Sequence, residues 1–163
     1  MRMDFIIKMM SFTAAAILLG FLGYSVAQDK PADNMQILRE KIKADKKLLV
    51  AANMDLTETE AKSFWPIYDQ YQKDLQKINQ RIVKVIESYA EDYRSLSLTD
   101  EKARKLIDEA LAIDKAEAGL KSTYAPKLAG VLPARKAMRY LQIENKIRAV
   151  VRYDIASGVP LVR

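Results

Sequence analysis

The sequence predicts an all-α fold, an elongated bundle of about four helices with a long, kinked helical hairpin at its centre. Three observations predict this class. Apolar residues recur at alternating spacings of three and four, threonines stand just before such runs as helix-start signals, and no long stretch alternates with the period of two that is typical of strands. Short links join these amphipathic segments, so the helices must fold back on one another to cover their apolar faces.

Residues 1–27 have the pattern of a cleaved signal peptide. A short basic start is followed by an almost wholly apolar stretch over residues 9–22, and Ser25 and Ala27 then fit the small-x-small pattern that signal peptidase recognises. The apolar run is about 14 residues long, whereas a membrane-spanning helix needs roughly 20. We therefore expect cleavage after Ala27, and a soluble periplasmic protein that folds as one helical domain over residues 28–163.

The first helix of the exported chain is expected over about residues 34–53. The second and longest is expected to start at Thr57, whose hydroxyl can cap the first turn while Glu60 reaches back to complete a capping box. Pro66 lacks a backbone donor, so we expect a kink close to it. This helix should end around residues 96–97. Its apolar stripe comprises Phe64, Tyr68, Tyr71, Leu75, Ile78, Ile82, Val85, Tyr89 and Tyr93.

Similar signals predict the last two helices. Thr99 is expected to cap the third helix, and Pro126 is expected to break or bend the chain. Pro133 stands where a first helical position is expected, and Gly158 together with Pro160 should end the last helix. Bent helices of this kind favour an elongated and concave bundle. The alternative that a second copy covers the apolar stripe, in a homodimer, is kept open.

The composition excludes several kinds of chemistry. The chain contains no Cys and no His, so it has no disulfide, thiolate nucleophile, sulfur-ligated zinc, Ser-His-Asp triad or imidazole-ligated metal. It has no Gly-rich phosphate loop and no EF-hand loop. We therefore predict a protein that is not an enzyme and that holds no cofactor and no metal. Weak metal binding by carboxylates alone stays open.

Positive charge is concentrated at the C-terminal end. The whole chain has a net charge of +6, and residues 121–163 contain nine basic and two acidic residues. A basic surface can hold nucleic acid, anionic lipid or an acidic protein surface. Export argues against nucleic acid. Envelope lipids, polyanionic glycans and unfolded protein chains remain as partners.

Two groups of side chains are candidate protein-binding residues. Trp65 and Tyr68 can offer rigid, amphipathic contact area, although the spacing also places Tyr68 on the core stripe. The second group is basic, and its alternative interpretation is a solvated helix face. It comprises Lys127, Arg135, Lys136, Arg139, Arg148 and Arg152. Within the same region, we expect Glu144 to form a structural ion pair with Arg148 one turn later.

Five segments carry a resemblance to a known family. Residues 56–60 (LTETE), 98–102 (LTDEK) and 131–136 (VLPARK) resemble the Leu-Thr-x-x-Gln element that opens helices in the Spy/CpxP-like family of periplasmic proteins. Residues 64–68 (FWPIY) and 152–161 (RYDIASGVPL) look like signatures of a poorly characterised branch of exported proteins. The resemblance implies an all-helical, cradle-shaped and often dimeric hairpin.

The same resemblance implies a function. Members of the family act as ATP-independent chaperones or as modulators of envelope-stress signalling, so we expect an exported, non-enzymatic binding protein with a chaperone-like role. A regulatory protein that docks on a membrane sensor kinase or another envelope partner stays open. An envelope protein that binds anionic lipid or glycan at the membrane surface also stays open.

Overall fold

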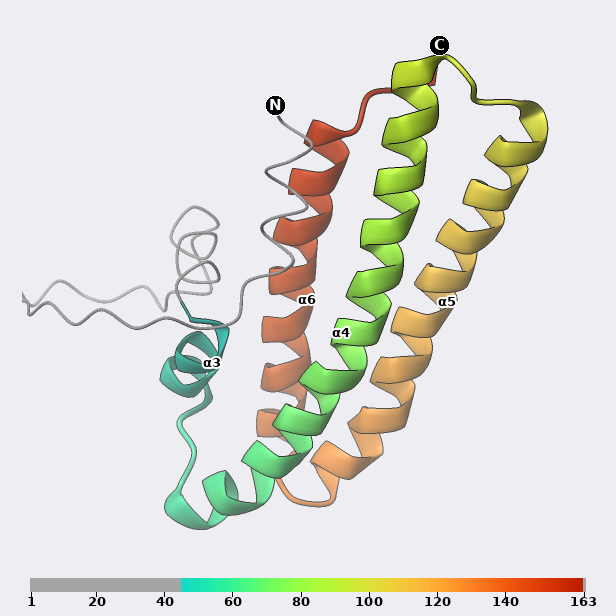
Figure 1. Ribbon diagram of the computed structural model, residues 1–163. Helices are drawn as coiled ribbons and strands as arrows, with labels where there is room; N and C mark the ends of the chain where they lie inside the picture. The colour runs from blue at the N-terminus through green and yellow to red at the C-terminus, as the bar shows by residue number, and fades with distance from the viewer. Residues whose placement is uncertain (1–44, 163) are drawn as a thin grey trace, which may run out of the picture.

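The computed structural model describes residues 45–162, and in this part of the chain the protein is all-helical, as predicted (Figure 1). The predicted signal peptide and most of the predicted first helix lie outside the described residues. The described helices are α3 (Lys46–Met54), α4 (Glu58–Ser95), α5 (Asp100–Ala129) and α6 (Ala134–Gly158). None of them is both long enough and apolar enough to cross a membrane.

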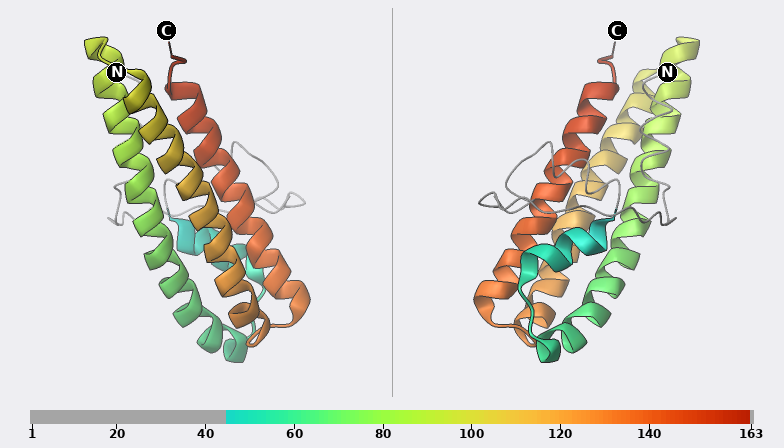
Figure 2. Two further views of the ribbon diagram at one scale, coloured as in Figure 1. Left: turned by 90° about the vertical axis from the view of Figure 1, so that its right-hand side faces the viewer. Right: turned by 90° about the vertical axis from the view of Figure 1, so that its left-hand side faces the viewer.

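Three long helices form the body of the bundle. α4, α5 and α6 follow one another up, down and up, joined by short turns (Figure 1). The two views in Figure 2 place the short α3 between α4 and α6, on the side away from α5. α3 therefore lies across the body of the bundle instead of extending it.

α4 and α5 begin where the sequence places their caps. The predicted first helix continues through Asp45, which is wrong at this position, because Asp45 has extended backbone and caps α3, which begins at Lys46. Thr57 Oγ1 accepts from the backbone N–H of Glu60 at 3.3 Å, and the Glu60 carboxylate accepts from the N–H of Thr57 at 2.8 Å, so the predicted capping box is confirmed. Thr99 caps α5 by accepting from the N–H of Lys102 at 3.3 Å. Both caps satisfy donors that the first helical turn leaves without partners.

The prolines disturb the helices less than the sequence suggests. α4 runs unbroken past Pro66, and its first turns bend away from the axis of the rest of the helix (Figure 1). Of the predicted break or bend at Pro126, the break is wrong, because α5 continues to Ala129 and this proline lies in its last turn. Its carbonyl accepts from the N–H of Gly130 at 3.0 Å, and the chain turns there. Pro133 is the N-cap of α6 and not its first helical residue.

The apolar core lies at the end of the bundle that α3 covers. Aromatic rings fill it: Phe64 and Tyr140 stack edge to face with centroids 5.1 Å apart, and Tyr71 and Tyr124 do the same at 5.3 Å. Leu49, Val50 and Met54 bring α3 into the same cluster. The core therefore joins all four described helices.

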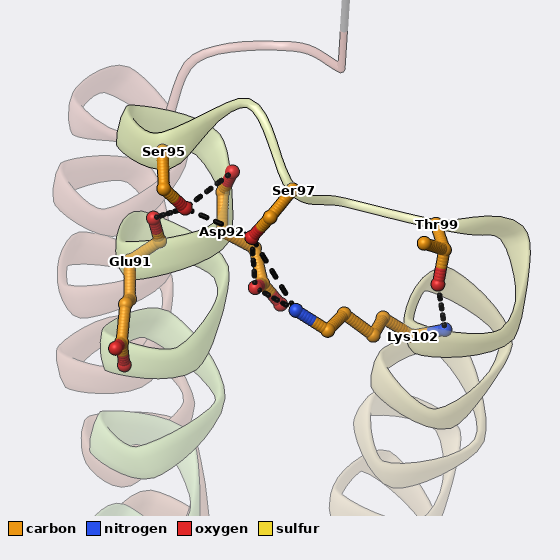
Figure 3. Close-up of polar contacts among 6 residues, drawn as sticks. All are labelled: Glu91, Asp92, Ser95, Ser97, Thr99 and Lys102. Carbon is orange, nitrogen blue, oxygen red and sulfur yellow. Dashed lines mark hydrogen bonds and ion pairs between the residues drawn. The ribbon is translucent and has the colours of Figure 1, made fainter.

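Asp92 holds the turn between α4 and α5 at the opposite end (Figure 3). Its carboxylate oxygen Oδ1 accepts from the Ser97 hydroxyl at 2.9 Å and from the Lys102 ammonium at 2.6 Å. Its backbone carbonyl accepts from the Ser97 N–H at 3.0 Å. Leu96, the C-cap of α4, has a left-handed backbone with a φ of 55°. One acidic side chain thus ties the end of α4 to the start of α5.

The pH dependence of stability is expected to report on this turn. The Lys102 ammonium and the Ser97 hydroxyl hold the pKa of Asp92 below its ordinary value of 3.8. A carboxyl group with a lower pKa in the folded chain stabilises the fold above the unfolded-state pKa, and this contribution is lost as the pH falls through the folded-state pKa. We therefore expect the urea midpoint to drop below about pH 5, and Asp92→Asn to weaken this dependence.

Urea unfolding followed by circular dichroism at several pH values measures this effect. Asp108→Asn is the matched control, because it removes one exposed carboxylate from α5 without touching the turn. An unchanged pH dependence in Asp92→Asn would contradict the assignment.

Candidate functional site

A buried polar network lies beneath α3. The Glu144 carboxylate is 0% exposed and contacts the Lys46 ammonium at 2.8 Å. The Gln72 amide links the two, because its oxygen accepts from Lys46 at 2.8 Å while its nitrogen donates to Glu144 at 2.8 Å and to the Tyr140 hydroxyl at 3.2 Å. A carboxylate without access to water needs such partners to stay charged. The network therefore fixes α3 against α4 and α6.

The expected ion pair between Glu144 and Arg148 does not form. Glu144 pairs instead with Lys46, which lies 98 positions earlier in the sequence. Both α6 side chains point into the bundle, but their ion-pair partners come from different helices, α3 for Glu144 and α5 for Arg148. The i, i+4 spacing on α6 therefore identifies two inward-facing charges and not a pair.

Arg148 belongs to a second buried layer, one turn further along α6. It forms an ion pair with Glu117 of α5 and donates to the Asn79 amide oxygen of α4 at 2.9 Å. Arg152 contacts the other Glu117 oxygen at 2.8 Å and Asp114 at 2.5 Å. Burial and the neighbouring Arg152 lower the pKa of Arg148 to about 10, so its guanidinium is still cationic at neutral pH. These two arginines link α6 to both of its long neighbours.

Lys136 and Arg139 tie the start of α6 to the loop after α3. The Lys136 ammonium contacts the Glu60 carboxylate at 2.5 Å and the Asp55 carbonyl at 2.7 Å. Arg139 donates to the Asn53 carbonyl at 3.1 Å and contacts the Asp55 carboxylate at 3.3 Å. The hydrogen bond from the Lys136 ammonium is the main reason why the pKa of Glu60 lies below its ordinary value.

An open depression of about 500 Å³ lies beside these contacts, and we call it the basic depression. It brings Arg135, Lys136 and Arg139 together around Met138, whose side chain is 60% exposed. Its complete lining is Met54, Asp55, Pro133, Arg135, Lys136, Met138, Arg139 and Gln142. Among the described residues, Arg135 has no ion-pair partner, so its charge faces the depression uncompensated.

The predicted aromatic residues lie at the other edge of α3. Tyr68 is buried in the core at 4% exposure, whereas Trp65 is half-buried against the core. The Lys47 ammonium lies 5.1 Å from the Trp65 ring centroid and 5.6 Å from that of Tyr68, within the range of cation–π attraction. Lys47 also pairs with the Asp69 carboxylate at 2.7 Å. This edge is therefore already in contact with α3.

The structure divides the predicted basic residues into three places. Three of them line the basic depression, as described above. Arg148 lies in the second buried layer, and the exposed Arg152 lies at the edge of that layer. Lys127 lies apart, with its ammonium 4.4 Å from the ring centroid of Tyr124 on its own helix. The predicted basic group is therefore not one continuous face.

Sequence reasoning missed the acidic partners of these cations. Residues 121–163 contain only two acids, so their positive charge looks uncompensated. The compensating carboxylates come from earlier segments, namely Asp55, Glu60, Asp114 and Glu117. The one signal in the sequence is that Asp114 and Glu117 stand three apart, and so share one face of a helix.

The arrangement offers cations and apolar contact area. Within residues 45–162, no group of three or more acidic side chains gathers closely enough to hold a metal ion. No protein-family model, curated protein or solved structure matches the chain.

Proposed function

We propose that this protein is an exported, non-enzymatic binding protein that holds partly unfolded or membrane-associated proteins without using ATP. The resemblance to the Spy/CpxP-like family and the signal-peptide pattern of residues 1–27 support export and a chaperone-like role. The basic depression is the observation that carries the proposal, because it combines uncompensated positive charge with exposed apolar surface.

Each side chain of the depression has a part in binding. Arg135 attracts acidic segments over a distance set by the ionic strength, about 8 Å at physiological salt. Met138 supplies a flexible, polarisable surface that adapts to different apolar side chains. Arg139 and Lys136 are held by their own ion pairs, so they keep the depression in shape. The favoured partner is a chain segment that carries both acidic and apolar residues.

A light-scattering assay tests this function. A chemically denatured, aggregation-prone enzyme is diluted into buffer with equimolar protein, and we expect suppressed scattering that weakens at high salt. The double variant Arg135→Glu/Met138→Ser should suppress scattering severalfold less, because it reverses the uncompensated charge and removes the apolar surface. No suppression by the unmodified chain in low or high salt would remove the chaperone proposal.

Arg104→Glu/Leu111→Ser is the matched control. It makes the same kind of change on α5, where Leu111 is 62% exposed, almost the same as Met138. An equal loss of suppression in both double variants would show that the depression has no special role. Capture of one defined envelope partner would favour the regulatory alternative, and salt-sensitive sedimentation with anionic vesicles would favour lipid binding.

A further inference from the structure

α3 lies over α4 and α6 (Figure 2). We call the set of side chains that α3 contacts on these two helices the α3 seat. The seat combines aromatic, acidic, amide and basic groups within reach of a single short helix. Its members are Trp65, Tyr68, Gln72, Arg139, Tyr140 and Glu144. The chemistry of α3 therefore shows what kind of helix the seat accepts.

The centre of the seat selects a lysine. Glu144 is fully buried, and an uncompensated carboxylate in such a place is unfavourable. The Lys46 ammonium satisfies it at 2.8 Å and at the same time donates to the Gln72 amide oxygen at 2.8 Å. A compact ammonium on a flexible stem fits this pair of acceptors, whereas a planar guanidinium has a different shape.

The rest of the seat contacts the apolar face and the C-terminal end of α3. Leu49, Val50 and Met54 follow Lys46 at three, four and eight positions, which places all four on one face, and the three apolar side chains are at most 2% exposed. At the other end, Arg139 donates to the Asn53 carbonyl at 3.1 Å, where the helix dipole favours a cation. Recognition thus extends over the whole length of α3.

α3 is also the helix that can leave with the least disturbance. It has nine residues, fewer than the roughly 12 that an isolated helix needs to be stable. α4 keeps its own capping box when α3 leaves, because Thr57 and Glu60 belong to α4 and its cap. Release also returns Glu144 and Lys46 to water, which offsets part of the attraction that is lost. We therefore expect α3 to open locally before the long helices unfold.

We propose that the α3 seat is an interaction surface for a short amphipathic helix of a partner protein that begins with a lysine, and that α3 fills the seat until such a helix displaces it. The partner helix carries apolar residues three, four and eight positions after the lysine. This surface borders the basic depression and shares Arg139 with it, but Arg135 and Met138, which carry the binding proposed for the depression, lie outside the seat.

A peptide added in trans tests the proposal. A fluorescein-labelled peptide with the sequence of residues 45–56 is titrated with the full-length chain, and binding is followed by anisotropy. Val50→Ala weakens the docking of α3 without changing the seat, so we expect this variant to bind the peptide about tenfold more tightly than the unmodified chain. A peptide with methionine in place of Lys46 should bind about tenfold more weakly, because it leaves Glu144 without a cation.

Two further variants keep the test decisive. Leu48→Ala is the matched control, because Leu48 is 67% exposed on the outer face of α3, and we expect no gain in peptide affinity. Asp45→Ala removes the exposed N-cap of α3, whose carboxylate accepts from the N–H of Lys47 and Leu48, and should raise the affinity about fivefold. If Val50→Ala fails to fold, Asp45→Ala replaces it as the variant in which the docking of α3 is weakened.

Three results would overturn the proposal. The first is the absence of saturable peptide binding to both α3-weakened variants while their helical content is unchanged. The second is equal binding of the lysine and methionine peptides. The third is a chain that elutes as a dimer and becomes a monomer when the peptide is added, because the seat would then hold α3 of a second copy. Arg135→Glu/Met138→Ser should leave peptide binding unchanged, which separates this test from that of the basic depression.

Discussion

Replacing Tyr140 by alanine is expected to lower the free energy of unfolding by about 3–5 kcal/mol. The Tyr140 side chain is 0% exposed, and its ring centroid lies 5.1 Å from that of Phe64 and 5.8 Å from that of Tyr71. Truncation removes these edge-to-face contacts and leaves a cavity between α4 and α6 that stiff aromatic neighbours cannot fill. Urea unfolding monitored by circular dichroism measures the loss.

Two variants separate the ring from its hydroxyl and from the helix that carries it. Tyr140→Phe keeps the ring and removes only the acceptor of the Gln72 amide, so we expect a loss of about 1 kcal/mol. Tyr153→Ala removes a tyrosine that is 65% exposed on the same helix, and should change stability by about 0.5 kcal/mol or less. A loss in Tyr140→Ala no larger than that in Tyr153→Ala would contradict the assigned core.

Replacing Glu117 by leucine is expected to destabilise the fold by about 3–5 kcal/mol. Arg148 is 5% exposed, and Glu117 supplies its carboxylate partner from α5. Without that carboxylate, the buried guanidinium keeps only the Asn79 amide and is repelled by the charge of Arg152. Urea unfolding at neutral pH measures this change.

The double variant Glu117→Leu/Arg148→Met distinguishes a missing partner from a loss of packing. Replacing both ions by apolar side chains of similar size removes the uncompensated charge, so we expect most of the lost stability to return. Glu109→Leu is the control, because it breaks the more exposed pair with Arg81 and should have a much smaller effect. A double variant as unstable as Glu117→Leu would show that the layer acts through shape and not through charge.

Local signals in the sequence predicted most of the helical architecture. The caps at Thr57 and Thr99 depend on a hydroxyl and a backbone N–H three residues later, so the sequence contains all of the information. The apolar spacing in residues 64–75 correctly identified the buried face of α4, because helix geometry places these residues in one stripe. Pro126 was misjudged because its effect depends on how near the helix end lies.

Burial along the same stripe was harder to predict. Tyr68 and Tyr71 are buried, whereas Tyr89 and Tyr93 continue the pattern but are only half-buried. These two lie near the turn that Asp92 holds, away from the apolar cluster beneath α3. Periodicity gives the direction of a side chain, but the neighbouring helices decide how much of it is covered.

The sequence by itself determined the three long helices, the caps at Thr57 and Thr99 and the face that α4 buries over residues 64–75, because these depend on residues within one or two turns of each other. Only the tertiary structure decided which charges meet. Lys46 and Glu144 are 98 positions apart and Glu60 and Lys136 are 76 apart, so their pairing depends on how α3, α4 and α6 are placed against one another. The same placement sets apart Arg135 at the depression from Arg148 inside the bundle, although both belong to one basic segment of the chain.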